Sequence, residues 1–320
     1  MNNFFIGPFK KSLFEYYQYK VSLGYIFEGA KNRLKIFDKY TCSLQCSDLT
    51  LQLIYNYLDE NKNIVGSTRN TYASAIRGYV QYLYDNGKCN FILSKKLYRK
   101  IKRKLPHIYK KAELKSFFKA LKDYSPNDKF KNNCFNLIFQ LLYCTGMRIK
   151  ECLNIKLNDI DFTTNSITLY NTKNNIDRRI VLKDAIMNEV FNYVTQYQDV
   201  INCNKEKYIF INSNLKKYNK CNVYYVFRVV LKLCGIHHDK NGPRIHDFRH
   251  TFCVNSYKQI LKKGGNYLNH IMALSAYLGH KSFISTEYYL RLTAELYPEI
   301  RNIINNYTGN IVKDMGDLYE

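Results

Sequence analysis

Residues 242–261, GPRIHDFRHTFCVNSYKQIL, indicate how the second half of the chain folds. A Gly-Pro pair is typical of a turn, and the residues after it predict a helix over 246–262. His246 and Arg249 are three residues apart, so both would lie on one face of the first turn. Because a helix N-terminus favours an anion, the two side chains could meet a negatively charged ligand there.

Four further polar residues lie at predicted element boundaries, where side chains can converge. Arg148 follows a Thr-Gly turn, Lys173 lies at the tip of a predicted hairpin, and His280 follows a Leu-Gly pair typical of a helix end. Tyr289 comes nine residues after His280. Each has an ordinary structural interpretation when taken alone, because a surface Arg or Lys, a hydrogen-bonded His or one of 30 tyrosines carries little information singly.

The second half mixes helical periodicity with one pair of short alternating runs. The runs 166–170 and 178–182 flank the polar turn NTKNNID and predict a β-hairpin. We therefore expect a mainly α-helical domain with one small sheet. Besides the helix over 246–262, helices are predicted over 112–123, 130–144, 147–157, 183–198, 222–234, 267–278 and 284–295.

Residues 1–92 are expected to be entirely helical, because their apolar period is helical and Pro is scarce. The clearest segment is 67–86, which a Ser or Thr at its start could cap and Gly87 would end. Arg69 and Arg77 lie off its apolar stripe, where they would be solvated charges or contacts to DNA phosphates. The stripe consists of Tyr72, Ile76, Tyr79, Val80 and Leu83.

The 320-residue chain is strongly basic, with 49 Lys and Arg against 26 Asp and Glu and a formal net charge of +23. An AT-rich coding sequence would favour Lys, but it would favour Asp and Glu as well, so the imbalance points to a polyanionic partner. A hydrophobic content of 46% and an aromatic content of 15% argue against disorder. No apolar run approaches the roughly 18–20 residues of a membrane helix, and we expect no membrane partner and no secretory signal.

Residues 95–111, KKLYRKIKRKLPHIYKK, carry nine Lys or Arg in 17 positions and no acid. So dense a run repels itself unless an anion lies against it, so we interpret it as an interdomain linker on a nucleic-acid backbone. A merely solvated linker is the alternative. By count, residues 1–110 hold 19 basic and 7 acidic residues (+12), which leaves +11 for the remainder, so both halves could grip DNA. The proposed linker contacts are Lys102, Arg103 and Lys104.

The ten cysteines indicate reduced, structural thiols in a cytoplasmic protein. None forms a C-x-x-C pair, and no Cys/His cluster has the spacing of zinc ligands, so we expect neither a metal nor any other cofactor. Four of them lie in apolar, helical stretches, where a thiol behaves as a small hydrophobe. These are Cys134, Cys144, Cys152 and Cys253.

Taken together, the motifs resemble the tyrosine recombinase/integrase family. T-G-M-R-I-K-E at 145–151, a hairpin Lys, H-D-F-R-H-T at 246–251, L-G-H at 278–280 and Tyr289 follow one another in that family's order. The run LGHKSFISTEYYLRLT is similar to the Xer-like, mobile-element branch. The resemblance implies a site-specific recombinase that breaks and rejoins double-stranded DNA.

The resemblance implies two domains and an assembly on DNA. Residues 1–104 would form a helical SAM-like core-binding domain, and 105–320 a catalytic domain with a C-terminal tail near 298–320. Four protomers would act on two sites, as a homotetramer or with a second recombinase, through a Holliday junction and without ATP or metal. Docking of the tail on a neighbouring protomer is also implied.

The chemistry suits the residue types. Charge builds on phosphate oxygens during attack, which two bidentate guanidiniums and histidine donors would stabilise, while a mobile Lys protonates the leaving 5′-oxygen. A tyrosine that holds the 3′-phosphate covalently conserves the bond energy. Glu151 is expected to support Arg148, and Asp247 to cap or orient its helix. The implied catalytic set is Arg148, Lys173, His246, Arg249, His280 and Tyr289.

Several alternatives stay open at this point. Tyr288 is a rival nucleophile, although neighbouring helical residues point about 100° apart and the spacing favours Tyr289. Lys183, Arg178 and Arg179 are rivals of Lys173 because hairpin length varies. A type IB topoisomerase, a catalytically silent DNA-binding accessory protein and an RNA-binding protein are the competing classes.

Overall fold

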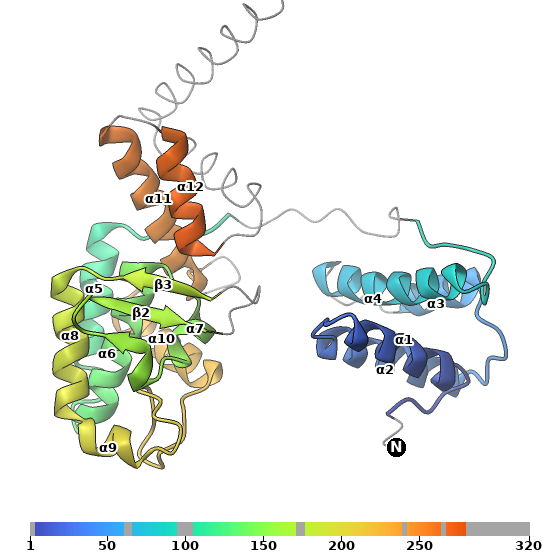
Figure 1. Cartoon of the computed structure of the whole chain (residues 1–320), viewed down its shortest axis with the longest axis horizontal. Helices are drawn as coiled ribbons and strands as arrows, with labels where there is room; N and C mark the ends of the chain where they lie inside the picture. Colours follow the sequence, from blue (N-terminus) through green and yellow to red (C-terminus); the bar gives the residue numbers. More distant parts are fainter. Residues whose placement is uncertain are drawn as a thin grey trace, which may run out of the picture. The chain divides into compact units, whose positions relative to one another are not determined.

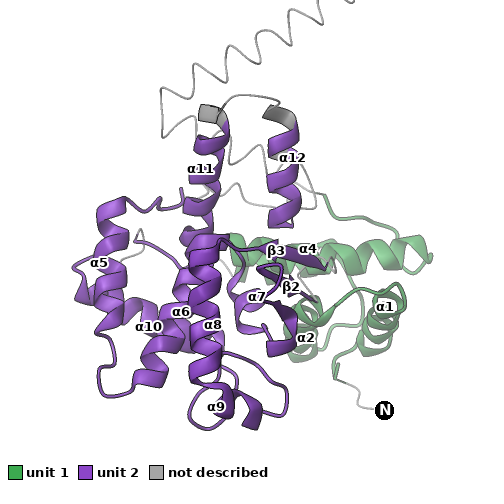
Figure 2. Cartoon of the chain, turned by 60° about the vertical axis from the view of Figure 1, so that its left-hand side comes forward, with its two compact units in different colours: residues 1–103 green, residues 104–320 purple. Residues whose placement is uncertain are grey.

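The computed structural model describes residues 4–60, 66–94, 105–170, 177–238, 242–263 and 267–279. The chain divides into two compact units, residues 1–103 (unit 1) and residues 104–320 (unit 2), which Figure 1 and Figure 2 show. Several predictions fall outside the described residues: those for Lys102, Arg103, Lys104, Lys173, His280, Tyr288, Tyr289, the helix over 284–295 and the tail near 298–320.

Unit 1 is helical throughout its described part, as predicted. Its core forms where the helices press their apolar faces together, and Leu13, Phe37, Ile54 and Tyr79 are fully enclosed in it. No strand occurs in the described part of this unit. The helices are α1 (Lys10–Ser22), α2 (Glu28–Ser43), α3 (Leu51–Glu60) and α4 (Gly66–Asp85).

Helix α4 confirms the predicted apolar stripe. Ile76, Tyr79, Val80 and Leu83 are buried, and Tyr72 is half-buried against the same core. The helix ends where predicted, because Gly87 adopts a left-handed conformation (φ 66°). The helix begins one residue earlier than predicted, at Gly66, so its Ser and Thr lie within the first turn and not at the cap.

The two arginines of α4 differ from the prediction. Arg69 is not a solvated charge: it is 6% exposed, its Nε donates to the Leu58 carbonyl at 3.1 Å, and its guanidinium lies 3.6 Å from Asp59. The long aliphatic stem of an arginine can be buried while the head finds polar partners, which an apolar-stripe analysis overlooks. Arg77 is half-buried and donates to the Leu93 carbonyl at 3.1 Å, so it fastens the segment after α4 to the helix.

Unit 2 combines helices with one small sheet, as predicted (Figure 1). The predicted hairpin is confirmed. The elements of unit 2, in chain order, are α5 (Lys111–Lys122), α6 (Lys129–Thr145), α7 (Ile149–Leu153), the 3-10 turn η2 (Leu157–Asp159), β1 (Ile160–Asp161), β2 (Ser166–Leu169), β3 (Arg178–Val181), α8 (Asp184–Gln196), α9 (Gln198–Cys203), α10 (Lys220–Leu233), α11 (His246–Lys263) and α12 (Tyr267–Leu278).

The sheet is antiparallel in the order β1-β2-β3. In the hairpin, Ile167 pairs with Ile180 and Leu169 with Arg178. The short strand β1, whose Ile160 also pairs with Ile167, was not predicted, because two residues are too few to show an alternating pattern.

The helix predicted over 147–157 is too long. Helix α7 covers five residues, and the chain then pairs with a distant segment: Leu157 donates to the Lys207 carbonyl and Ile209 to the Ile155 carbonyl. These long-range backbone bonds satisfy the groups that a longer helix would have used.

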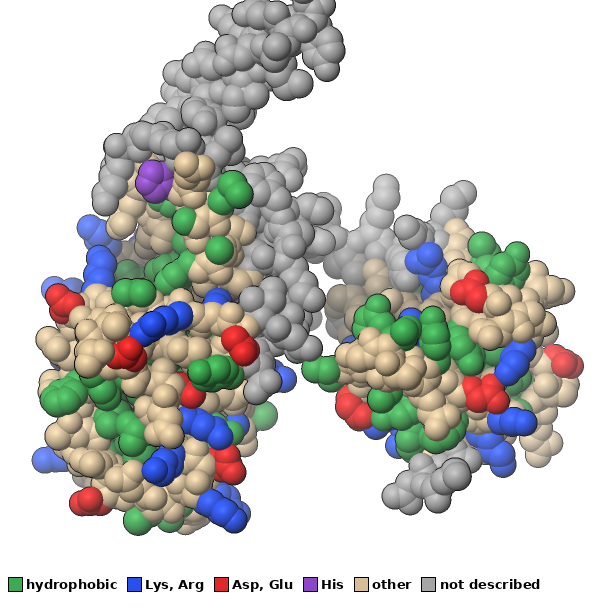
Figure 3. All heavy atoms as spheres, viewed as in Figure 1, with side chains coloured by type: hydrophobic (Ala, Val, Ile, Leu, Met, Phe, Trp, Pro, Cys, Tyr) green, Lys and Arg blue, Asp and Glu red, His purple; other side chains and the backbone are tan. Residues whose placement is uncertain are grey.

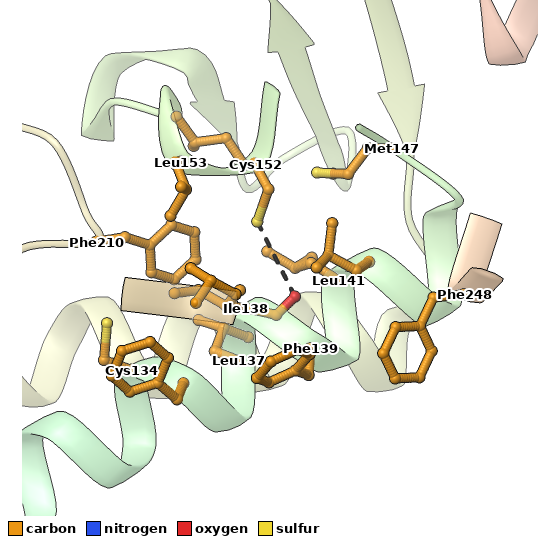
Figure 4. Close-up of a cluster of buried hydrophobic side chains, with 14 of the residues drawn as sticks. Cys134, Leu137, Ile138, Phe139, Leu141, Met147, Cys152, Leu153, Phe210 and Phe248 are labelled. Carbon is orange, nitrogen blue, oxygen red and sulfur yellow. Dashed lines mark hydrogen bonds between the residues drawn. The ribbon is translucent and has the colours of Figure 1, made fainter. Parts of the chain in front are cut away.

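The core of unit 2 surrounds α6 and is rich in aromatic rings. Phe117, Phe139, Phe227 and Phe248 are fully buried and pack against one another. Figure 4 shows the neighbouring part of this core, where Cys134 and Cys152 sit among apolar side chains, as predicted for structural thiols.

Cys253 is likewise buried, whereas Cys144 lies in a helix as predicted but is exposed, so it is not a small buried hydrophobe as the other three are. It lies on the outer face of the last turn of α6, between the buried Leu141 and Thr145. All ten cysteines are free thiols.

Two buried residues anchor the chain, one just before the basic run and one near its end. On the unit 1 side, Leu93 is buried at 4% exposure. On the unit 2 side, Tyr109 is equally buried: its backbone N–H donates to Thr251 Oγ1 at 3.0 Å, and its ring stacks on Phe248 with centroids 4.7 Å apart. Both Thr251 and Phe248 belong to α11.

Two surface properties complete the description. On the face shown in Figure 3, the basic side chains of the described residues are interspersed with acidic ones. None of the helices within the described ranges has the length and apolar character that a membrane span requires.

Candidate active site

The first turn of α11 presents two histidines and an arginine. His246 begins the helix, and its ring meets that of His250 edge to face with centroids 4.9 Å apart. Asp247 is fully buried and accepts a hydrogen bond from the Arg244 backbone N–H at 2.8 Å and one from its guanidinium at 3.3 Å. Asp247 therefore caps the start of α11, which confirms the prediction.

Arg249 is buried and joins two distant segments. Its Nη1 donates to the Gly146 carbonyl and its Nη2 to the Leu278 carbonyl, each at 2.8 Å. Gly146 ends α6 in a left-handed conformation (φ 64°), and a Cβ there would lie 2.5 Å from the Phe252 ring on α11. Only glycine lets the end of α6 approach α11 this closely.

Arg148 stands at the N-cap of α7, where Glu151 supports it in two ways. Its Nη1 donates to Glu151 Oε1 at 2.8 Å, and its backbone N–H donates to Oε2 at 2.8 Å. The arginine side chain keeps 22% of its surface exposed, whereas the glutamate keeps 4%. The expected support of Arg148 by Glu151 is confirmed, and it leaves the guanidinium an accessible face.

A third arginine, Arg178 at the start of β3, completes the arrangement. Its Nη1 and Nη2 pair with the two carboxylate oxygens of Glu151 at 3.1 and 2.7 Å, and its Nε donates to the Tyr277 carbonyl at 2.9 Å. From the sequence, Arg178 is only a rival of Lys173, and this role is not apparent. The available signal was strand alternation, which places Arg178 on the same face as the buried Ile180.

The end of α12 is held by all three arginines. Helix C-terminal carbonyls lack partners within the helix, and cations are favoured beside them. Because each arginine comes from a different element, this end of α12 is the point where α7, β3 and α11 meet. It directly precedes His280 in the sequence. The carbonyl of Tyr277 accepts from Arg178, that of Leu278 from Arg249, and that of Gly279 from Arg148 at 3.3 Å.

The other rivals of Lys173 lie elsewhere. Arg179 occupies the opposite face of β3, where its Nε donates to Ser166 Oγ and its Nη2 contacts Asp161, each at 2.5 Å. Lys183 is an exposed residue at the N-cap of α8. Arg178 is committed to three hydrogen bonds, and an arginine does not give up its proton, so it is unsuited to be a general acid.

The electrostatics of the cluster favour neutral histidines. Although His246 as a whole is exposed, the atoms packed around its ring, and then the charges of His250 and Arg249, lower its pKa to about 4. Burial and then Arg244 and Arg249 lower the pKa of His250 to about 4 as well. Both rings are therefore neutral near pH 7 and can donate a hydrogen bond without adding charge.

The carboxylate beneath the cluster keeps its charge. Burial tends to raise the pKa of Glu151, but hydrogen bonds from Arg178 and Arg148 outweigh it and hold the pKa below its ordinary value. In the part of the chain that the structure describes, no three His, Cys, Asp or Glu side chains are grouped to hold a metal ion.

The described site thus brings together three of the predicted residues, Arg148, His246 and Arg249. Arg148 and Arg249 are both close enough to His246 to lower its pKa. Two permanently charged guanidiniums and a neutral imidazole at a helix N-terminus form an arrangement suited to a phosphodiester and to charge that develops on its oxygens.

Solved structures show the same fold. The XerH site-specific recombinase bound to palindromic difH substrate matches with a TM-score of 0.65 at 17% identity, over 86% of this chain and 80% of that one. The Tn1549 transposon integrase in complex with a circular intermediate DNA matches with a TM-score of 0.61 at 17% identity, over 87% and 94%. The fold is therefore that of the tyrosine recombinases.

The sequence comparisons agree. The phage integrase family matches residues 107–295. The tyrosine recombinase XerA of Pyrococcus furiosus is 30% identical over 215 residues, which is 66% of this chain and 67% of that protein. The chain belongs to the phage integrase family, and it is a tyrosine recombinase. Members of this family are site-specific recombinases that cleave and rejoin DNA.

Proposed function

We propose that the protein binds duplex DNA and exchanges strands at a specific site through a 3′-phosphotyrosyl intermediate. The observation that carries this proposal is the convergence of Arg148 and Arg249 beside His246, with both guanidiniums bonded to the end of α12. A phosphodiester offers the oxygens that two guanidiniums and an imidazole N–H match.

Each residue has a role in the proposed step. Arg148 and Arg249 hold the non-bridging oxygens, and His246 and His280 donate further hydrogen bonds to them. The Tyr289 oxygen bonds to phosphorus and gives its proton to water, while the bond from phosphorus to the 5′-oxygen breaks and Lys173 protonates that oxygen. Cations beside a phenol, whose pKa is ordinarily about 10, favour its deprotonation.

The neutrality of the histidines fits this chemistry. Because the pKa of His246 lies at about 4, its ring is uncharged at neutral pH and can donate a hydrogen bond from one nitrogen. The positive charge of the site is then concentrated on the arginines, which cannot lose it. The reverse attack by the 5′-hydroxyl rejoins the strand, because the covalent link conserves the bond energy.

The DNA grip is proposed to involve both units. Unit 1 would be the core-binding domain and unit 2 the catalytic domain, with Arg77 and the run containing Lys102, Arg103 and Lys104 on the backbone. The net charge of +23 supports this grip, as does the fact that the XerH and Tn1549 neighbours were solved with DNA. Arg69 does not belong to this proposed grip, because its guanidinium is packed inside unit 1.

We also propose an assembly and a biological context. Four protomers on two sites would carry out two rounds of exchange through a Holliday junction. A role in a mobile element is supported by the likeness to the Tn1549 transposon integrase. The reaction needs neither ATP nor metal, since the tyrosine supplies the nucleophile and the arginines supply the charge.

Covalent trapping tests the proposed function. The protein is mixed with nicked suicide duplexes that carry the repeats flanking its gene, without ATP or metal, and adducts are separated on denaturing gels. The wild type and the matched control Tyr288→Phe are expected to form an adduct, and Tyr289→Phe is expected to form none. An adduct with Tyr289→Phe would overturn the nucleophile. Tight binding without any adduct would favour a DNA-binding accessory protein.

A further inference from the structure

Arg178 is a buried arginine that the proposed chemistry does not use. It begins β3, and 7% of its side chain is exposed, while its neighbour Arg179 on the other face keeps 51%. An arginine this deeply buried is costly to hold unless its hydrogen bonds are made, so its partners are informative.

Those partners lie on two separate elements. The guanidinium meets both oxygens of Glu151 on α7 at 3.1 and 2.7 Å, a bidentate geometry that fixes the plane of the carboxylate. Its Nε holds the Tyr277 carbonyl on α12 at 2.9 Å. One side chain from β3 thereby sets the distance between α7 and the end of α12.

Both elements contact the two arginines that hold the phosphate oxygens in the proposed function, Arg148 and Arg249. The carboxylate that Arg178 orients is the one on which Arg148 rests, at 2.8 Å from Nη1 and at 2.8 Å from the backbone N–H. The helix end that Arg178 holds also accepts from Arg249 one residue later, at the Leu278 carbonyl.

The chain also makes room for this arginine. Gly279 follows with φ 66°, and a Cβ at that position would lie 2.9 Å from Arg178 Nη1 and 3.3 Å from its central guanidinium carbon. A glycine here therefore lets the guanidinium lie directly against the backbone that leads to residue 280.

We infer that Arg178 is a positioning residue for DNA cleavage, which acts through Glu151 on Arg148 and through the end of α12 on Arg249. The inference rests on the proposed function. Arg178 does not touch the phosphate: it sets the angle and depth of the guanidiniums that do. A misplacement of about 1 Å in a positioned reactant lowers a reaction rate on the order of 10²-fold, so substitution of Arg178 is expected to change the cleavage rate.

The test separates binding from cleavage. The dissociation constant for the nicked duplex and the rate of adduct formation at saturating DNA are measured for the wild type, Arg178→Gln, Arg178→Lys and the matched control Arg179→Gln. Arg178→Gln is expected to bind within about threefold of the wild type and to cleave on the order of 10²-fold more slowly. The cleavage rate of Arg178→Lys is expected to lie between those of the wild type and Arg178→Gln, because a lysine keeps the charge but not the paired N–H donors of a planar guanidinium. At saturating DNA, Arg179→Gln is expected to cleave as the wild type does.

A double-mutant cycle assigns the route through Glu151. If Arg178 acts through this carboxylate, the two substitutions are not additive, and Arg178→Gln lowers the rate far less in a Glu151→Gln background than alone. Additive losses would overturn that route.

The remaining outcomes are also decisive. A cleavage rate within about threefold of the wild type for Arg178→Gln would overturn the inference. Thermal unfolding is recorded for each variant, and if Arg178→Gln does not fold, a natively folded Arg178→Lys with the wild-type rate would overturn it instead. If the wild type itself forms no adduct, the proposed function fails, which is a separate result.

Discussion

The substitution Gly146→Ala probes the contact between the end of α6 and α11, where the Gly146 carbonyl accepts a hydrogen bond from Arg249. Its cost in free energy of unfolding follows from the structure. Two effects add. Alanine at φ 64° costs about 1–2 kcal/mol because its Cβ crowds the backbone. The same Cβ would lie 2.5 Å from the Phe252 ring in a packed core, and overpacking of this kind costs about 1–3 kcal/mol.

The chain offers a matched control in Gly235. It has φ 69°, and a Cβ there would meet nothing within 4 Å. Gly235→Ala therefore carries only the backbone cost of about 1–2 kcal/mol. The difference between the two variants isolates the clash with Phe252.

Thermal denaturation followed by circular dichroism measures both effects. At about 2–4 °C per kcal/mol, Gly235→Ala is expected to lower the Tm by about 2–8 °C and Gly146→Ala by about 4–20 °C. The cleavage rate should fall only for Gly146→Ala, because the Gly146 carbonyl accepts from Arg249 at 2.8 Å. Equal shifts in Tm for the two variants, with no loss of cleavage, would refute this account of the α6–α11 contact.

Three further predictions follow from charge and from the tail. The pKa of His246 and that of His250 fall to about 4 on folding, from an unfolded value of about 6.5. The free energy of unfolding is therefore not reduced by these two groups above pH 6.5, and it decreases as the pH falls toward 4, because the unfolded chain binds protons that the folded protein does not. Denaturant titrations between pH 4 and pH 7 should show this slope, and it should flatten in His250→Gln; an unchanged slope would refute it. DNA affinity should fall steeply with salt, with a log–log slope of about −0.9 for each phosphate neutralised, whereas a nearly flat dependence would contradict a broad backbone grip. Deletion of residues 299–320 should impair synapsis, seen as loss of paired-site complexes in gel shifts, more than single-site binding; equal losses would contradict a role of this segment between protomers.

The elements that repeat a pattern over many residues could be predicted from the sequence. Helix α4 shows its buried stripe directly, and the hairpin shows a short alternating run on each side of a polar turn. Strand β1 could not be predicted because its two residues are too few to show an alternating pattern, and the early end of α7 could not because long-range backbone bonding to residues 207–209 decides it. No local pattern carries that information.

The same distinction applies to the candidate site. Arg148, His246 and Arg249 could be proposed because they stand in ordered motifs at element boundaries. The role of Arg178 depends on which carboxylate and which carbonyl the fold brings to it, so only the structure shows it. The burial of Arg69 could not be predicted for a related reason, since the fold brings the Leu58 carbonyl and the Asp59 carboxylate to its guanidinium.

The two buried anchors, Leu93 before the basic run and Tyr109 near its end, limit the length of chain that joins the units. Leu93 and Tyr109 are both buried, and 16 residue steps (109 − 93) separate them. A fully extended chain spans at most about 3.3–3.6 Å per residue, so the tether reaches no further than about 53–58 Å. One turn of B-form DNA is about 34–36 Å long. In the proposed complex with DNA, the two anchors of one protomer would therefore lie no more than roughly one and a half helical turns apart along the duplex.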